Sequence, residues 1–148
     1  MTKRWLSCGS VSLLTKDDLH LFNEGSHFRL YDKLGAHLVA SGDQEGAYFA
    51  VWAPDADKLT VIGDFNGWNT ASHPLHPQGQ SGIWEGFIPG VRKGDCYKYH
   101  LESRYGNYRV DETDPFAFHC EVTPKTGSIV WDLEYAWGDQ AWMGKRRK

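Results

Sequence analysis

The chain contains little cysteine, and the cysteines that it has follow no familiar pattern. Its 148 residues include 3 cysteines, Cys8, Cys96 and Cys120. An odd number of cysteines without the spacing of a zinc or redox motif indicates reduced thiols. His119 stands beside Cys120, but no second pair follows at the spacing of zinc ligands. We therefore expect no metal site, and we expect no cofactor.

The chain also lacks a strong net charge and a long apolar segment. Its net charge is -3 at pH 7 and its pI is ≈ 6.1, whereas proteins that bind nucleic acid present a basic face to the phosphates. The basic residues 145–148 are more simply a solvated tail or the start of a further element. Polar residues interrupt the stretch from Leu6 to Leu14, and no segment approaches the ~20 apolar residues of a membrane span. We therefore expect a cytoplasmic chain without a secretion signal, and neither nucleic acid nor membrane as a partner.

Aromatic residues, in contrast, are abundant. They make up 14% of the chain, with 7 Trp, 7 Tyr and 7 Phe, and the hydrophobic fraction is 41%. A chain of this length forms one domain, or one compact domain with an appendage, and has ample apolar material for a core. Some of the flat rings are therefore expected to serve a purpose outside the core.

The sequence before residue 45 has a helical pattern. Thr15 can cap a short helix, with Asp18 at the capping-box position. A second short helix is expected to begin at Ser26 and to stop at Gly35, followed by a polar loop at residues 41–46. The apolar stripe of this second helix would be Phe28, Leu30, Tyr31 and Leu34.

From residue 45 the hydrophobic period changes to two, and turn residues recur every few positions. This pattern is typical of a β-sandwich, and because no crossover helix separates the segments, its strands should be antiparallel. We predict a mainly β fold with a helical lead-in at residues 1–44, a sandwich at 45–133 and a linker at 134–148. The expected strands are residues 48–53, 59–62, 83–88, 96–103, 108–110 and 128–131.

Strand parity assigns side chains to faces in the clearest strands. Lys98 and His100 alternate with apolar residues, so they should point outward and Lys98 should be available to a ligand. The alternative for Lys98 is an ordinary solvated lysine. The predicted core residues are Trp52, Tyr97, Tyr99 and Leu101.

The hexapeptide Gly-Asp-Phe-Asn-Gly-Trp at residues 63–68 ends a β-rich segment with a turn. Asn66 and Gly67 both tolerate positive φ, which places Trp68 just beyond the turn at the rim of a sheet. An exposed indole suits the apolar face of a sugar, another protein or a neighbouring domain. The alternative is that Trp68 folds back as a lid over the core.

Trp68, Lys98 and the turn aromatics Tyr105 and Tyr108 belong to the same predicted sandwich. Aromatic planes beside an ammonium donor suit a neutral, polyhydroxylated ligand. No catalytic residue is expected, because the acidic residues lack the paired arrangement of a glycoside-cleaving site and are better explained as surface or turn carboxylates. Those residues include Glu85, Glu102, Asp111 and Asp114.

Seven segments carry a family resemblance. They are residues 18–25 (DLHLFNEG), 27–37 (HFRLYDKLGAH), 49–54 (FAVWAP), 63–68 (GDFNGW), 97–99 (YKY), 114–117 (DPFA) and 131–133 (WDL). Together they make the chain resemble the amino-terminal region of bacterial-type 1,4-α-glucan (glycogen) branching enzymes. The resemblance covers the chain from about Asp18 onward.

This resemblance implies that the sandwich is an immunoglobulin-like carbohydrate-binding module. Such modules precede the catalytic domain of branching and debranching enzymes and occur in glycogen-binding subunits of a metabolic kinase. In the glycogen-binding relatives a turn tryptophan, a lysine and a later aromatic hold the glucan, and these positions fall on Trp68, Lys98 and Tyr108. The relatives often carry Trp where this chain has Tyr108. The resemblance also implies that residues 134–148 lead toward a catalytic (β/α)₈ barrel that this chain does not contain.

Three functions remain open. The first is a non-catalytic module of a branching enzyme in glycogen biosynthesis, which binds α-1,4-glucan (glycogen or malto-oligosaccharide), docks on the catalytic barrel, or does both. The second is a purely structural module whose aromatics only pack on that barrel. The third is a free-standing glycogen-targeting subunit, which the segments at residues 28–34 and 131–142 argue against because they resemble branching enzymes outside the sandwich. An autonomous enzyme is the weakest alternative.

Overall fold

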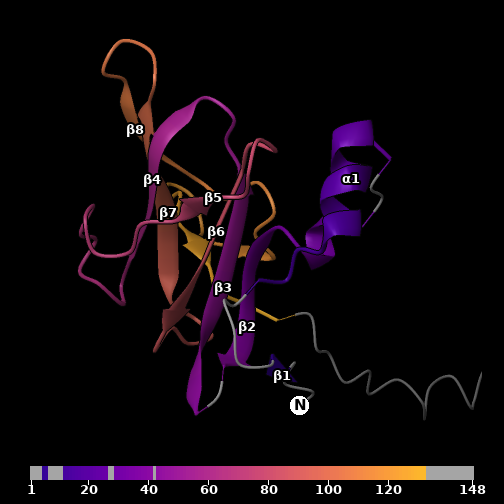
Figure 1. Cartoon of the computed structure of the whole chain (residues 1–148). Helices are drawn as coiled ribbons and strands as arrows, with labels where there is room; N and C mark the ends of the chain where they lie inside the picture. Colours follow the sequence, from indigo (N-terminus) through magenta and orange to yellow (C-terminus); the bar gives the residue numbers. More distant parts are fainter. Residues whose placement is uncertain (1–4, 7–11, 27–28, 42, 133–148) are drawn as a thin grey trace, which may run out of the picture.

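The computed structural model is a two-sheet β-sandwich with a short helix beside one sheet (Figure 1), which confirms the predicted mainly β, antiparallel fold. It describes residues 5–6, 12–26, 29–41 and 43–132. The first sheet has the strand order β1-β2-β3-β6-β5, and only its β1–β2 pair is parallel among the described strands. Its strands are β1 (Trp5–Leu6), β2 (Gly35–Ser41), β3 (Gln44–Trp52), β5 (His76–Pro77) and β6 (Ile83–Pro89).

The second sheet is antiparallel throughout its described strands. Its order is β4-β7-β10-β9, and β8 pairs with the same strand β7. Its strands are β4 (Ala56–Gly63), β7 (Cys96–Ser103), β8 (Arg109–Glu112), β9 (His119–Cys120) and β10 (Ser128–Ile129). β7 therefore pairs with three other strands and is the central strand of this sheet.

The main core lies between the two sheets. Tyr97 and Tyr99 are 0% and 2% exposed, as strand parity predicts, and Leu101 is half-buried against the same cluster. The buried side chains of this cluster include Phe49, Val51, Leu59, Val61, Trp84, Tyr97, Tyr99 and Val130. Because the alternation in β7 holds, Lys98 and His100 lie on the outer face of the sheet.

The prediction of Trp52 as a core residue is wrong, because its side chain is 53% exposed. Trp52 is the last residue of β3, and its parity is that of Tyr48 and Ala50 rather than that of Phe49. That face of β3 is covered by the N-terminal segment instead of by the second sheet. At the end of the strand the Phe22 ring contacts Trp52, with the centroids 6.0 Å apart, and Gly82 lies close to its indole nitrogen.

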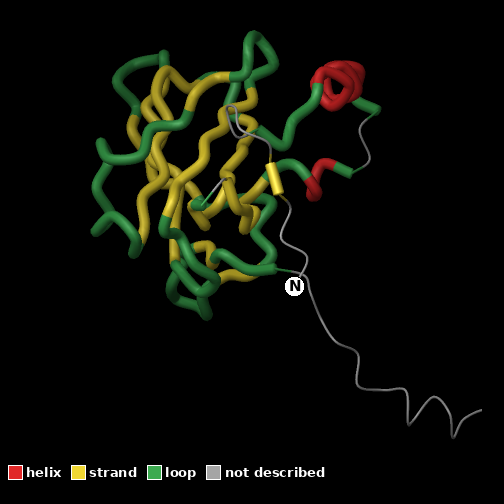
Figure 2. The backbone as a smooth tube through the Cα atoms, turned by 60° about the horizontal axis from the view of Figure 1, so that its bottom comes forward, coloured by secondary structure: helices red, strands yellow, loops and turns green. Residues whose placement is uncertain are grey.

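Helix α1 (Lys16–Glu24) forms as the sequence predicts. The hydroxyl of Thr15 accepts a hydrogen bond from the Asp18 backbone nitrogen, and the Asp18 carboxylate accepts one from the Thr15 nitrogen. Gly25 ends the helix with φ 75. Figure 2 shows the helix on one side of the strand layers, beside the sheet that contains β2 and β3 in Figure 1.

The prediction of a second helix from Ser26 to Gly35 is wrong in its length. Only a 3₁₀ turn, η1 (Leu30–Asp32), is present, and Phe28 lies outside the described residues. Gly35 begins β2 instead of stopping a helix, and its φ of 94 and close approach to Phe116 explain the glycine. β2 occupies a segment that we expected to be helical or loop, because its seven residues pair with β3 along their whole length and tertiary pairing outweighs local preference.

Several predictions fall outside the described residues. These are the linker at residues 134–148, its basic end, and Cys8. In the part of the chain that the structure describes, no helix is both long and apolar enough to cross a membrane.

Candidate functional site

The turn after β4 is built by the side chain of Asn66. Its Oδ1 accepts a hydrogen bond from the Gly63 nitrogen at 3.0 Å, and its Nδ2 donates to the Val61 carbonyl at 2.9 Å. Gly63 has no room for a larger residue, because a Cβ there would lie 2.3 Å from the Cys96 carbonyl oxygen. Phe65 turns inward and packs on Phe49, with ring centroids 6.1 Å apart. The turn is thus fixed to the sandwich by Asn66 and by Phe65.

Trp68 projects from this turn into solvent. Its backbone adopts the left-handed conformation with φ 61, and its nitrogen donates to the Gly63 carbonyl at 3.0 Å. The side chain is 39% exposed, which confirms the predicted exposure at the sheet rim. Among the described residues the indole has no hydrogen bond and no ring partner. The exposed part of the indole is therefore accessible to a ligand.

Lys98 lies in the outer face of β7, opposite Ile62 of β4. Its side chain is half-buried, and Nζ donates to the Thr126 hydroxyl at 2.6 Å. This bond uses one of the three ammonium donors, so the lysine is held in place and still has donors for a ligand.

Polar contacts continue this outer face along β7. His100 Nδ1 lies 2.7 Å from Asp111 Oδ1, and Arg109 Nε lies 3.9 Å from Glu102 Oε1. These contacts explain Glu102 and Asp111 as surface carboxylates that face basic side chains. They also show that Arg109 shares the outer face with Glu102, its partner in the strand register.

Tyr108 is 58% exposed and lies at the other end of β7. Its carbonyl accepts a hydrogen bond from the Ser103 nitrogen at 2.8 Å, and the neighbouring loop residue Tyr105 is 70% exposed. β7 has 8 residues, so at about 3.3 Å per residue its ends are roughly 23 Å apart. The structure therefore brings Trp68 and Lys98 to one end of β7 and leaves Tyr108 at the other.

Asp114 begins a turn, as one of the two predicted alternatives requires, but it is not a surface carboxylate, because it is 3% exposed. Its Oδ2 accepts hydrogen bonds from the Tyr97 hydroxyl at 2.6 Å and from the Tyr99 hydroxyl at 3.1 Å, while Oδ1 accepts one from the Phe116 nitrogen at 2.9 Å. Burial raises the pKa of Asp114, and these hydrogen bonds oppose that rise. The residue joins β7 to the segment after β8.

Glu85 is likewise a structural carboxylate, at the centre of β6. It accepts hydrogen bonds from the Tyr48 hydroxyl at 2.5 Å, from the Ser12 hydroxyl at 2.7 Å and from the Gln78 side-chain amide. Burial and the bond to Glu85 raise the pKa of Tyr48, so this hydroxyl stays protonated and donates. The partners of Glu85 and Asp114 are hydroxyl and amide groups. Neither site has the pair of carboxyl groups that glycoside cleavage requires.

Two thiols lie in the described part of the chain, Cys96 and Cys120, and both are free. Burial, and then the charges of Glu121 and Asp64, raise the pKa of Cys96 to about 11, so this thiol is protonated at neutral pH. No group of three or more His, Cys, Asp or Glu side chains among the described residues is arranged to hold a metal ion.

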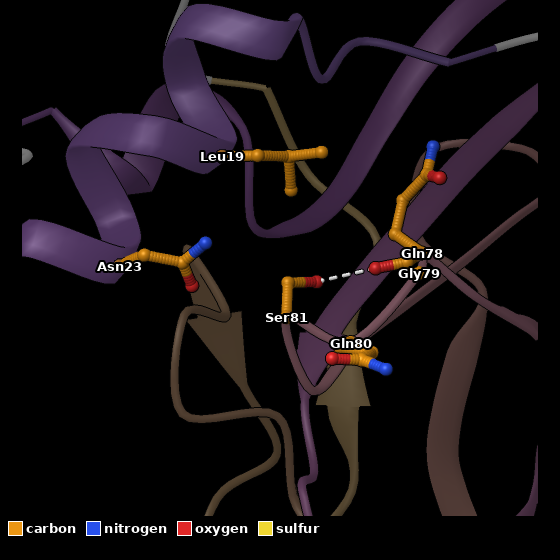
Figure 3. Close-up of a pocket in the computed structure, with 6 residues that line it drawn as sticks. All are labelled: Leu19, Asn23, Gln78, Gly79, Gln80 and Ser81. Atoms are coloured by element: carbon orange, nitrogen blue, oxygen red, sulfur yellow. Dashed lines mark hydrogen bonds between the residues drawn. The ribbon is translucent and has the colours of Figure 1, made fainter.

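One feature that sequence reasoning missed is a groove of ≈ 430 Å³ between α1 and the turn before β6 (Figure 3). It is lined by Leu19, Asn23, Gln78, Gly79, Gln80 and Ser81. The glycines around residues 79–82 indicated a turn in the sequence, but nothing there indicated that α1 would pack beside it.

Comparison with known proteins gives the chain a family context. Residues 33–117 match the model of carbohydrate-binding module 48, the isoamylase N-terminal domain. The 1,4-alpha-glucan branching enzyme GlgB of Synechococcus sp. (strain JA-2-3B'a(2-13)) is 52% identical over 130 residues, which are 87% of this chain and 17% of that protein. The enzyme of the same name from Aquifex aeolicus is 47% identical over 138 residues, or 93% of this chain and 22% of that protein. The chain thus spans about a fifth of the length of these relatives.

Solved structures agree with the fold. The Klebsiella pneumoniae pullulanase complexed with maltotriose matches with a TM-score of 0.55 and 29% sequence identity, over 76% of this chain and 11% of that chain. The apo pullulanase of Paenibacillus barengoltzii matches with a TM-score of 0.55 and 25% identity, over 76% of this chain and 18% of that chain.

Proposed function

The chain belongs to the carbohydrate-binding module 48 family, and from this premise we propose that it is the non-catalytic N-terminal module of a cytoplasmic 1,4-α-glucan branching enzyme. In this proposal the parent protein acts in glycogen biosynthesis, and the chemistry takes place in its catalytic barrel. The module binds α-1,4-glucan, as glycogen or malto-oligosaccharide, and docks on the barrel of its own chain.

The observation that carries the proposal is the exposed indole of Trp68 on a rigid turn. The flat apolar face of a glucose unit stacks on such a ring, and the fixed turn reduces the ordering that binding would otherwise require. Lys98 lies at the same end of β7 and can donate to sugar hydroxyls beside the ring. We place Tyr108 outside this short-oligosaccharide site and expect it to contact only glucans long enough to reach along β7.

A structural role in packing on the barrel is the second candidate. Large apolar side chains are also exposed away from the Trp68 turn, among them Tyr31, Trp52 and Trp131 at 46%, 53% and 38%. Such rings suit an interdomain contact as well as a sugar. A free-standing targeting subunit is disfavoured, because the similarity to branching enzymes reaches 93% of the chain and extends beyond the matched family segment.

Calorimetric titration of the chain with maltoheptaose tests the proposal. We expect Trp68→Ala to leave the melting temperature nearly unchanged and to weaken binding by about thirtyfold or more, since a central aromatic anchor contributes ~2 kcal/mol or more. Lys98→Ala should weaken binding less, because an exposed ammonium exchanges water for sugar hydroxyls. The matched control is Trp131→Ala, which removes an indole of similar exposure whose ring already packs on His119 and Lys93. If the wild-type chain had no affinity for maltoheptaose, glucan binding would be contradicted and the packing role would be the better explanation.

A further inference from the structure

The turn at residues 63–68 is held by a side-chain amide whose orientation the backbone fixes. Asn66 Oδ1 accepts a hydrogen bond from the Gly63 nitrogen at 3.0 Å, and Nδ2 donates to the Val61 carbonyl at 2.9 Å. A flipped amide would place two donors together at Gly63 and two acceptors together at Val61, so only one orientation satisfies both backbone groups. The second proton of Nδ2 is left for the remaining partner, His73 Nδ1, at 2.9 Å.

This amide determines the protonation state of His73 that fits the turn. Because Asn66 Nδ2 is a donor, the imidazole nitrogen that faces it must accept, which requires a neutral ring with its proton on Nε2. Protonation adds an N–H at Nδ1, and two donors then face each other at hydrogen-bond distance. The Asn66 amide cannot turn over to relieve this conflict without losing both of its backbone bonds.

His73 is placed for this contact by its own backbone and by its ring. The His73 carbonyl accepts a hydrogen bond from the Val61 nitrogen at 3.1 Å. Its ring packs edge-on against Phe65, with the centroids 5.8 Å apart. The residue is half-buried, so the ring is held beside Asn66 and still exchanges its proton with solvent.

The side-chain partners of His73 in the described part of the chain, Asn66 and Phe65, are uncharged. The charged or titratable residues of the elements around it are Asp57 and Lys58 of β4, Asp64 of the turn and His76 of β5. The Asp64 carboxylate accepts a hydrogen bond from the Cys96 nitrogen at 3.0 Å. None of these four residues forms a hydrogen bond or ion pair with His73, so none of them offsets the conflict that protonation creates.

The backbone of Trp68 depends on the same bonds. Its φ is 61, and its nitrogen donates to the Gly63 carbonyl at 3.0 Å. This left-handed conformation is unfavourable for a residue with a Cβ and persists only while the surrounding structure enforces it. Because Asn66 holds the Gly63 nitrogen, loss of the Asn66 bonds releases Trp68 from this conformation.

We infer that neutral His73 is a positioning residue for Trp68, and that protonation of His73 loosens the turn and weakens glucan binding. His73 acts through Asn66 and does not itself contact the glucan. A histidine side chain ordinarily gains its proton between about pH 8 and about pH 5, so the effect belongs to that range. The choice of glucan as the ligand rests on the proposed function, whereas the coupling of His73 to the turn does not.

NMR of the isotope-labelled full chain, without ligand, tests the coupling. At about pH 8 the ring-nitrogen chemical shifts of His73 should show a protonated Nε2 and an unprotonated Nδ1. As the pH falls, the Asn66 side-chain NH₂ signal and the Trp68 indole signal should shift with the midpoint of the His73 ring. His73→Asn keeps an oxygen acceptor at the position of Nδ1 and does not titrate, so these shifts should be absent in it. A Trp68 signal that does not follow His73 would overturn the inference.

Calorimetric titration with maltoheptaose tests the consequence for binding. We expect the wild-type affinity to fall by about tenfold from about pH 8 to about pH 5, since one hydrogen bond is replaced by two opposed donors. His73→Asn should bind equally at both pH values. His73→Phe keeps an aromatic ring but has no acceptor, so it should bind weakly at both. The matched control is His76→Asn, which removes an exposed histidine of β5 and should retain the wild-type pH dependence.

The outcomes separate this inference from the proposed function. If the Trp68 signal follows His73 but the chain has no affinity for maltoheptaose at either pH, the coupling is supported and glucan binding is contradicted. Equal wild-type affinity at both pH values would overturn the role of His73 in binding and leave the proposed function intact. A pH dependence that persists in His73→Asn would belong to another group, such as His100 on the outer face of β7, and would also overturn that role.

Discussion

At the scale of single residues, the position of Trp68 depends on the side chain of Asn66, which holds the preceding turn. Asn66 bonds to Gly63 and Val61, and its Nδ2 also lies 2.9 Å from His73 Nδ1. One amide thus ties the turn to β4 and to the chain that follows it. The side chain imitates a backbone turn, which is the property that makes asparagine common at such positions.

We expect Asn66→Ala to destabilise the chain by ~1–3 kcal/mol, because it leaves the Gly63 nitrogen and the Val61 carbonyl without partners. It should also weaken maltoheptaose binding although Trp68 is unchanged. Denaturant unfolding and calorimetry measure the two effects. The control is Asn69→Ala, since Asn69 is exposed and makes a single bond to the Ala71 nitrogen. Equal stability in the two variants would argue against this role of Asn66.

Asp114 should make stability depend on pH in the acid range. Burial raises its pKa above the ordinary value of 3.8, so the folded chain binds this proton more tightly than the unfolded chain. The stabilisation is complete below that ordinary value and is lost as the pH rises through the raised pKa. In Asp114→Asn this contribution disappears. The free energy of unfolding of the wild-type chain, minus that of the variant, should therefore fall as the pH rises across this window, and a constant difference would contradict the assignment.

At the scale of elements, β3 has two covered faces, and this determines which substitutions are costly. One face packs against the second sheet through Phe49, and the other lies under the N-terminal segment through Tyr48. Where the strand ends, at Trp52, that second cover ends too. The burial of a strand residue is therefore set by the element opposite it as well as by parity.

Tyr99→Ala and Trp52→Ala form a matched test of this arrangement. Tyr99 is fully packed between the sheets and bonded to Asp114, so its truncation should cost ~3–5 kcal/mol. Trp52 is 53% exposed and loses contacts with Phe22 and with the chain at Gly82, so its truncation should cost clearly less. Thermal unfolding compares the two, and a larger loss for Trp52→Ala would show that its ring packs elsewhere.

Sequence reasoning succeeded where local chemistry decides the structure. The capping box of Thr15 and Asp18 predicted α1, and alternation predicted the burial of Tyr97 and Tyr99, because these signals lie within a few residues. It failed for β2, because residues 41–46 were expected to form a polar loop, whereas Ser41 and Gln44 pair in a hairpin. It also failed for Trp52, because its covering helix is distant in sequence. The same reason applies to the groove, whose two walls come from separate parts of the chain. Trp68 and Lys98 lie at the same end of β7, whereas the hairpin of β7 and β8 places Tyr108 at the other end.

At the scale of the whole molecule, the proposed binding surface extends along β7, and the chain has little net charge. Trp68 and Tyr108 lie at opposite ends of β7, and the net charge is only -3 at pH 7. Because the ligand is uncharged, affinity for glycogen should change little between low and high salt, in contrast to a phosphate-binding surface. A steep decrease with salt would indicate an ionic partner.

The separation of Trp68 from Tyr108 predicts a dependence on glucan length. A trisaccharide at the Trp68 end cannot extend along the roughly 23 Å of β7, whereas a long linear glucan can follow the sheet. Trp68→Ala should therefore weaken the binding of maltotriose and of long amylose chains alike. Tyr108→Ala should leave maltotriose affinity unchanged and weaken only the long chains, by several-fold, as expected for a peripheral ring. Calorimetry with both ligands distinguishes these cases. An equal loss for maltotriose in the two variants would mean that Tyr108 lies within the primary site.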